Sequence, residues 1–159
     1  MIRNAMYSMA FSAAIAGCGS IAPATVEPPA PRAERSEALL QALLALGVDY
    51  RYGGGSPATG YDCSGLVAHI YREAWGISLP HNTAAQSKAG IPVSLAELQA
   101  GDLVFYDTQK QPYSHVGIYL GDGRFVHAPK TGAQVRIESL KSAYWSQRYS
   151  GARHIEPPL

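Results

Sequence analysis

The chain has 159 residues, enough for one domain with a substantial core. Apolar residues make up 47% and charged residues 16%, which is typical of a globular protein rather than a disordered one. With 13 basic and 12 acidic residues the formal charge is +1, so we expect no nucleic-acid partner. No apolar run reaches the roughly 18 residues of a membrane-spanning helix. The two cysteines, Cys18 and Cys63, exclude a disulfide framework and a four-cysteine zinc site.

The first 17 residues have the pattern of a secretory signal: one basic residue, Arg3, a short apolar run and small residues before Cys18. The stretch Ile-Ala-Gly-Cys at 15–18 resembles the lipobox of bacterial lipoproteins, whose cysteine is lipidated and becomes the first residue. This resemblance implies a lipid-anchored protein of the cell envelope. In a Gram-negative host it implies the periplasmic side of the outer membrane, because no Asp follows Cys18. A plain cleaved signal and a cytosolic N-terminus are the alternatives.

A proline-rich tether is predicted over residues 18–33, and the folded domain over residues 34–159. Cleavage before Cys18 would remove Arg3 and leave equal numbers of basic and acidic residues. We therefore expect a monomeric domain that is held off a membrane by its tether and does not attract its substrate by net charge.

The domain begins with helical patterns. The first helix is predicted over residues 34–46, with Gly47 as its stop. Its expected buried face consists of Leu39, Leu40, Leu43, Leu44 and Leu46. A loop follows over 49–60. A second helix begins at Asp62 or Cys63 and ends at Gly76, and its buried stripe is Leu66, Val67, Ile70, Tyr71 and Ala74. A third, shorter helix is predicted over 82–89 and a turn over 95–98.

Strand patterns dominate the second half of the domain. They cover residues 102–106, 115–120, 124–128, 135–137 and 151–155, with a short helix over 141–148 between the last two. Helices that come first and consecutive strands that come later predict an α+β fold, in which N-terminal helices pack on an antiparallel sheet.

The register of one predicted hairpin decides how two histidines meet. The stretch Gly-Asp-Gly at 121–123 joins two strand patterns. With a three-residue loop, Leu120 lies opposite Arg124 and Gly117 lies opposite His127. His115 and His127 then become diagonal cross-strand neighbours on one face, and Gly117 leaves room for the imidazole. A two-residue loop would place the two histidines on opposite faces.

Cys63 is the candidate nucleophile. At the start of a helix its sulfur faces backbone N–H groups and the positive end of the helix dipole, which should lower the pKa of the thiol. Asp62 is placed to cap that helix. The alternative is a small buried core residue, which is what most cysteines are.

A nucleophilic cysteine needs a base, and the residue types fit a triad of Cys63, His115 and His127. One imidazole takes the thiol proton to give an ion pair, and the other fixes the tautomer of the first. The alternatives are two ordinary sheet histidines or a zinc site. No acidic partner for the pair is evident nearby in the sequence. His69, His81 and His154 lie outside this pattern.

Five motifs in order resemble the NlpC-type cell-wall cysteine peptidases: Tyr-Arg-Tyr-Gly-Gly at 50–54, Asp-Cys-Ser-Gly at 62–65, Gly-Asp-Leu-Val-Phe at 101–105, His-Val-Gly-Ile-Tyr at 115–119 and Val-His-Ala at 126–128. The resemblance covers about residues 36–155. It implies a circularly permuted, papain-like fold with Cys63 as nucleophile, His115 as base and His127 as the third member. It also implies that Tyr50 helps to bind the oxyanion, and that Asp62 and Ser64 shape the substrate pocket.

The implied function is a peptidoglycan endopeptidase that hydrolyses stem-peptide or cross-link amide bonds without a metal or organic cofactor. The alternatives are a noncatalytic wall-binding or phage-tail module, and an amidase or acyltransferase on the same fold. Because one domain follows the tether, we expect an open groove that admits cross-linked peptidoglycan. The sequence departs from the family's usual Leu-Pro-Arg at 79–81, where His81 replaces the arginine and Asn82 follows, and it carries a triple glycine at 53–55.

Overall fold

The computed structural model describes residues 31–158. The predicted signal, Cys18 and most of the predicted tether lie outside the described residues. The first helix, α1 (Pro31–Leu44), begins three residues before the expected start, inside the stretch predicted as tether. Proline suits the first turn of a helix because its missing N–H would have no partner there.

The other helices follow the predicted order. They are α2 (Cys63–Trp75), α3 (Thr83–Gln86), the single 3₁₀ turn η1 (Leu95–Glu97) and α4 (Ala143–Ser146). Gly76 ends α2 with a left-handed backbone (φ 65°), as the sequence predicts. No helix within residues 31–158 has the length and apolar character needed to span a bilayer.

Six strands form one antiparallel sheet in the order β3-β8-β4-β5-β6-β7. Their bounds are β3 (Ile91–Val93), β4 (Leu103–Tyr106), β5 (His115–Gly121), β6 (Arg124–His127), β7 (Arg136–Ser139) and β8 (Tyr149–His154). A two-stranded ribbon, β1 (Gly55–Ser56) with β2 (Gly60–Tyr61), precedes α2. The sequence analysis missed β1, β2 and β3. The α+β class is confirmed.

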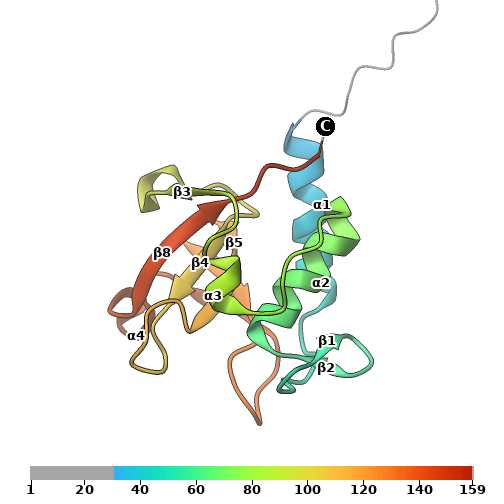
Figure 1. Ribbon diagram of the computed structural model, residues 1–159, viewed down its shortest axis with the longest axis vertical. Helices are drawn as coiled ribbons and strands as arrows, with labels where there is room; N and C mark the ends of the chain where they lie inside the picture. Colours follow the sequence, from blue (N-terminus) through green and yellow to red (C-terminus); the bar gives the residue numbers. More distant parts are fainter. Residues whose placement is uncertain (1–30, 159) are drawn as a thin grey trace, which may run out of the picture.

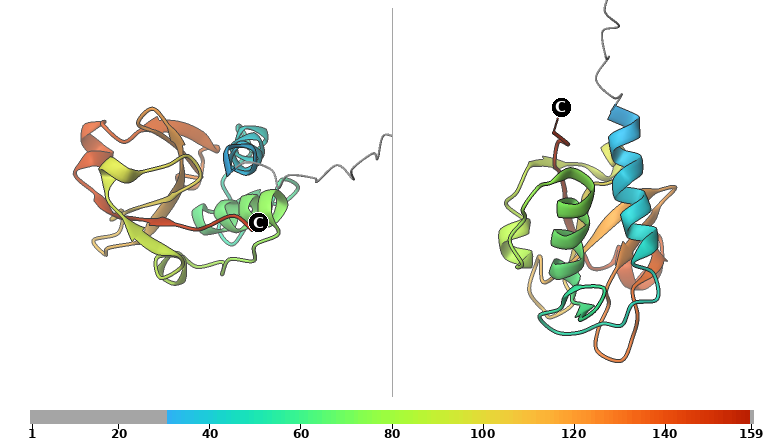
Figure 2. Two further views of the ribbon diagram at one scale, coloured as in Figure 1. Left: turned by 90° about the horizontal axis from the view of Figure 1, so that it is seen from above. Right: turned by 90° about the vertical axis from the view of Figure 1, so that its right-hand side faces the viewer.

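The two long helices lie side by side and cover one face of the curved sheet (Figures 1 and 2). The main core lies between them and the sheet. It includes Leu66, Ile70 and Tyr71 from α2 and Phe105, Val116 and Ile118 from the strands. The opposite face carries a second cluster beneath α4, which consists of Val104, Tyr106, Phe125, Trp145 and Ala152.

The predicted buried face of α1 is wrong. Leu40, Leu43, Leu44 and Leu46 are 38–67% exposed, whereas Ala38, Ala42 and Ala45 are buried. These alanines recur at helical spacing and join the core that α2 also lines. Their small side chains allow the two helix backbones to approach closely, which a leucine face would prevent.

The hairpin register at the histidines is confirmed, but the predicted turn is wrong. Ile118 pairs with Val126 and Tyr119 with Phe125, which extends to Gly117 opposite His127. Arg124, however, pairs with Gly121 instead of Leu120, because the register shifts beyond Tyr119. A bulge in β5 and a shorter turn thus replace the three-residue loop and keep both histidines on one face.

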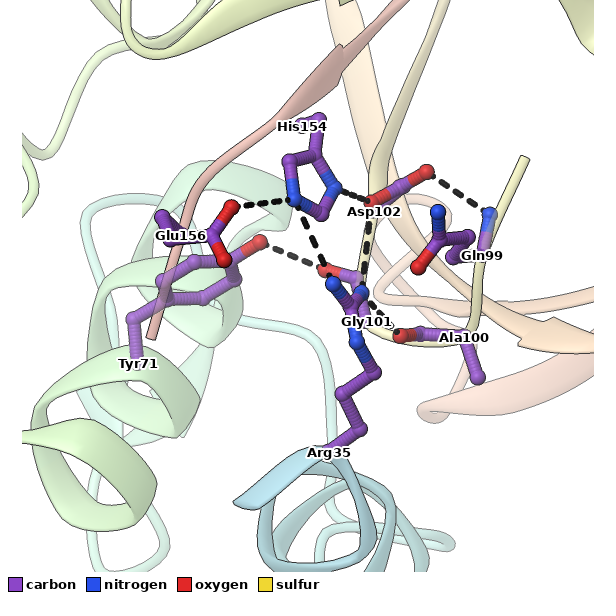
Figure 3. A network of polar contacts seen from close by, with 8 residues as sticks. All are labelled: Arg35, Tyr71, Gln99, Ala100, Gly101, Asp102, His154 and Glu156. Carbon is purple, nitrogen blue, oxygen red and sulfur yellow. Dashed lines mark hydrogen bonds and ion pairs between the residues drawn. The ribbon is translucent and has the colours of Figure 1, made fainter. Parts of the chain in front are cut away.

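A buried polar network ties both helices to the sheet on the side shown in Figure 3. Asp102, the residue before β4, is 1% exposed, and its carboxylate lies 2.7 Å from His154 Nδ1 of β8. The guanidinium of Arg35 on α1 lies 3.9 Å from the same oxygen. Tyr71 of α2 donates a hydrogen bond to the carbonyl of Gly101 (2.5 Å). The network therefore joins α1, α2, β4 and β8.

Candidate active site

Cys63 is the first residue of α2, and Asp62 caps the helix as predicted. The Asp62 carboxylate accepts a hydrogen bond from the backbone N–H of Gly65 (2.7 Å). Burial raises the pKa of the Cys63 thiol to about 11, although backbone N–H groups of Val116, Ser64 and Cys63 itself favour the thiolate. The expected lowering of this pKa is therefore wrong, because loss of solvation outweighs the helix N-terminus.

The Asp62 carboxylate also joins three other parts of the site. It accepts hydrogen bonds from the backbone N–H of Gly53 (2.9 Å) and from the hydroxyl of Ser64 (3.1 Å). Nε2 of His81 lies 2.8 Å from the same carboxylate. Asp62 thus fixes the loop before β1, the first turn of α2 and the His81 side chain relative to one another.

Two glycines give His81 its place. A Cβ on Gly65 would lie 2.6 Å from His81 Nε2, and one on Gly55 would lie 3.5 Å from His81 Cε1. The imidazole therefore rests against the backbone of α2 and of β1. Gln86 is fully buried nearby, and its amide donates hydrogen bonds to the carbonyls of Ser64 (2.9 Å) and Pro80 (2.8 Å). Sequence reasoning missed Gln86.

The predicted histidine pair is formed. His115 Nε2 and His127 Nδ1 lie 2.8 Å apart, and the two side chains are almost completely buried. Gly117 leaves the room that was expected, because a Cβ there would lie 2.7 Å from the carbonyl oxygen of Val126 and 3.3 Å from His127 Cβ.

Both imidazoles are neutral at pH 7. Burial, then the neighbouring His127, lowers the pKa of His115 to about 3. Burial, then the charge of Arg136, lowers the pKa of His127 to about 3. Cys63 and His115 thus rest as a neutral thiol and a neutral base, so the predicted ion pair requires transfer of the thiol proton.

Two residues that sequence reasoning missed surround the pair. Trp145 of α4 stacks on His115, with ring centroids 5.5 Å apart and planes 22° apart, and packs edge-on against His127. Glu138 of β7 places a carboxylate oxygen 3.6 Å from His127 Nε2. The available signal was the alternation of Arg136 and Glu138 along a strand, but the predicted strand ended at residue 137.

A groove of about 600 Å³ opens at the nucleophile. Its lining includes Tyr50, Asp62, Cys63 and Ser64 together with residues of the 81–84 and 109–114 segments. Tyr50 also lines a second cavity of about 470 Å³, together with Lys130, Arg136, Glu138 and Trp145. Tyr50 therefore borders both the cysteine side and the histidine side of the site.

The Tyr50 hydroxyl is a candidate hydrogen-bond donor. Burial, then the nearby Cys63 and Asp62, raises the pKa of its phenol, so the hydroxyl keeps its proton at neutral pH. The predicted pocket residues Asp62 and Ser64 line the groove, as do His81 and Asn82. His69 and His154 do not line it: His69 packs against Tyr61, and His154 contacts Asp102. Within residues 31–158, no group of three His, Cys, Asp or Glu side chains is arranged to hold a metal ion.

The comparisons with known proteins agree on one family. Residues 47–154 match the model of the NlpC/P60 family. The chain is 40% identical over 124 residues to the murein DD-endopeptidase MepH of Escherichia coli K12, covering 76% of this chain and 46% of that protein. It is 44% identical over 109 residues to the murein DD-endopeptidase MepS, also named murein LD-carboxypeptidase, of the same strain, covering 69% and 56%.

A solved structure supports the same fold. The structure of an NlpC/P60 family protein from Bacillus cereus superposes with a TM-score of 0.72 at 34% identity, covering 77% of this chain and 40% of that one. The chain thus spans about half the length of the curated relatives named above.

Proposed function

The chain belongs to the NlpC/P60 family, and from this premise we propose that it is a cysteine endopeptidase that hydrolyses amide bonds in the peptides of peptidoglycan. One observation carries the proposal: Cys63 lies at the start of α2 against the backbone of Val116 on β5, and the residue before Val116, His115, is hydrogen-bonded to His127. The names of the relatives supply the substrate class, since both are murein DD-endopeptidases.

The first chemical step is proton transfer to His115. Its Nε2 is engaged by His127, so Nδ1 is the nitrogen that accepts the thiol proton. The Cys63 thiolate then attacks the substrate carbonyl carbon, and the carbonyl π electrons move onto oxygen. The Tyr50 hydroxyl donates a hydrogen bond to this oxyanion. Backbone N–H groups at the start of α2 favour the negative sulfur before the attack.

Collapse of the tetrahedral intermediate re-forms the carbonyl and breaks the C–N bond. His115 gives its proton to the leaving amine, which leaves an acyl-thioester on Cys63. A water molecule then attacks the thioester while His115 takes its proton. The acyl group leaves as a carboxylic acid and the thiol is restored. Because His115 is buried and rests neutral, it is a base before each attack and an acid after it.

Digestion of purified peptidoglycan tests the proposal. Cys63→Ala should abolish cleavage and leave the unfolding midpoint nearly unchanged, because the cysteine supplies the covalent step and little volume. His115→Ala should be almost as severe. Masses of the fragments identify the bond that is cut: the D-Ala cross-link or the γ-D-Glu stem bond.

The substrate set distinguishes the alternatives. Intact sacculi and a free γ-linked tripeptide are digested in parallel. Cleavage of sacculi supports an enzyme of the polymeric wall, whereas cleavage of the tripeptide alone indicates an enzyme of released fragments. Binding to sacculi with no cleavage by the wild-type protein would instead indicate a wall-binding module.

The location of the enzyme is a separate proposal. We infer that Cys18 is lipidated and anchors the chain in the cell envelope, on the strength of the Ile-Ala-Gly-Cys stretch at 15–18. Cys18→Ala should move the full chain from the membrane fraction to the soluble fraction and leave its activity in vitro unchanged. A mature N-terminus at any residue other than Cys18, measured by mass spectrometry, would disprove the anchor.

A further inference from the structure

We propose that Glu138 is a positioning residue for the histidine pair, which holds the proton of His127 on Nε2 and so extends the catalytic series by one member. The inference rests on the proposed function, because it assigns Glu138 a part in activating the thiol. It starts from the sheet register. His127 on β6 pairs with Arg136 on β7, so Glu138 is its diagonal neighbour on one side. His115 on β5 is its diagonal neighbour on the other.

The proton positions follow from the direction in which the proton must move. His115 can take the thiol proton at Nδ1 only if its own proton is on Nε2. That N–H then donates to His127 Nδ1 at 2.8 Å, which makes His127 Nδ1 an acceptor. The proton of neutral His127 must therefore lie on Nε2.

His127 Nε2 needs an acceptor that the pair itself does not supply. The atom is buried and has no hydrogen-bond partner among the described residues, and His127 is 0% exposed. The carboxylate of Glu138 faces it, with Oε1 at 3.6 Å. We infer that this carboxylate is the acceptor toward which the Nε2–H is directed. The other tautomer would direct an unprotonated nitrogen at a carboxylate, which electrostatics disfavours.

Two neighbours hold Glu138 at this distance. Arg136 contacts the same oxygen, Oε1, through Nε at 2.6 Å and through Nη2 at 2.5 Å. The indole N–H of Trp145 contacts the other oxygen, Oε2. Trp145 also stacks on His115, so one side chain covers the histidines and orients the acid behind them. Glu138 is therefore held at the pair and is not a free surface acid.

The charged groups around His127 determine in which direction the pKa of the histidine pair should change when each is removed. The titratable or charged groups that contact the pair or act on its pKa values are Tyr106 from β4 and Arg136 and Glu138 from β7. Cys63 of α2 lies against Val116, the residue after His115. The Glu138 carboxylate raises the pKa of His115, and the Arg136 guanidinium lowers the pKa of His127. Removing the Glu138 carboxylate should therefore lower the apparent pKa of the pair, and removing the Arg136 guanidinium should raise it.

The decisive experiment is NMR of the imidazole nitrogens in a Cys63→Ala background, where no catalysis is needed. His127 should carry its proton on Nε2 at neutral pH. In that background Glu138→Gln should lower the apparent pKa of the pair and Arg136→Gln should raise it. Lys130→Gln is the matched control, because it removes a cation from the same cavity but no contact of Glu138. Its shift should be smaller than either of the other two.

Several outcomes overturn the inference. They are a proton on Nδ1 of His127, shifts of the same sign in the Glu138 and Arg136 variants, and no shift in Glu138→Gln. If the Glu138 variant fails to fold, the tautomer of His127 in protein that keeps Glu138 still decides, since a proton on Nδ1 contradicts the proposal.

The role of Glu138 in catalysis is measured separately, from the kinetics of peptidoglycan hydrolysis. With peptidoglycan as substrate, Glu138→Gln should lower kcat about tenfold with little change in KM. This is much less than the loss of roughly 10⁴-fold when the orienting acid of a serine-protease triad is neutralised. The acid limb of its pH profile should move to lower pH. If wild-type protein cuts no peptidoglycan, the proposed function fails, while the nitrogen spectra still test the role of Glu138.

Discussion

At the scale of single residues, the proposed nucleophile and base are both buried and both neutral at pH 7. Burial raises the pKa of Cys63 and lowers the pKa of His115, so neither carries charge in the resting state. The ion pair must therefore form during the reaction, when the same backbone N–H groups and the second histidine stabilise it. A neutral thiol is also a weaker nucleophile toward stray electrophiles than a thiolate.

The sequence predicts the positions of these residues better than their electrostatics. The diagonal placement of His115 and His127 was predicted from the period of two in strands and an assumed three-residue turn. The structure reaches the same register with a shorter turn and a bulge in β5, which the sequence analysis did not predict. The same register also predicted that position 117, opposite His127, needs a residue without a side chain. The pKa of Cys63 could not be predicted, because it depends on how deeply β5 and its neighbours bury the sulfur. Glu138 was missed because β7 runs two residues further than its pattern indicated.

At the scale of elements, α1 shows how composition can mislead. Five leucines predicted a buried face, yet α1 packs through Ala38 and Ala42, and Ala45 in the turn that follows joins them in the core. Two faces of this helix are apolar, and hydrophobicity alone cannot decide which one faces the core. Close approach of α2 decides it, since only the alanine face lets two helices meet at short range.

This packing gives a paired prediction for stability. Ala42→Leu should lower the free energy of unfolding by about 1–3 kcal/mol, because three extra carbons must be accommodated where Ala42 is 0% exposed. Leu44→Gln, at a position 67% exposed, should change it by less than about 0.5 kcal/mol. Urea unfolding measures both. A larger loss for Leu44→Gln than for Ala42→Leu would mean that the leucine face is the packed one.

At the scale of the whole molecule, the order of the helices and strands along the chain was enough to predict the fold class. Helices first and strands later predicted the α+β class, and each of the five expected strands is present within a few residues. The short strands β1, β2 and β3 have no period of their own, because pairs of two or three residues depend on their partners. The polar network that connects α1, α2 and β8 was also not predicted. Its members, at positions 35, 71, 102 and 154, are distant in the chain.

Substitution of Asp102 measures how much this network contributes to the free energy of unfolding. Its buried carboxylate contacts His154 and Arg35 and accepts a hydrogen bond from the backbone N–H of Gln99 (2.8 Å) (Figure 3). Asp102→Ala leaves the Gln99 N–H without its acceptor, His154 without its partner and the Arg35 guanidinium without its counter-charge. Removing one partner of a buried ion pair costs about 3–5 kcal/mol, and we expect a loss of that order in the free energy of unfolding.

The matched control is Glu156→Gln, which removes a carboxylate that also contacts His154 (2.9 Å) but is 77% exposed. Exposed pairs contribute about 0–1 kcal/mol, so this variant should unfold close to the wild type. Asp102→Asn, which keeps an oxygen for the Gln99 N–H, should fall between the two. Asp102 does not line the groove at Cys63, so the specific activity of folded Asp102→Ala at low temperature should match the wild type. Equal stability of the Asp102→Ala and Glu156→Gln variants would show that packing of α1 and α2, rather than this network, holds the helices to the sheet.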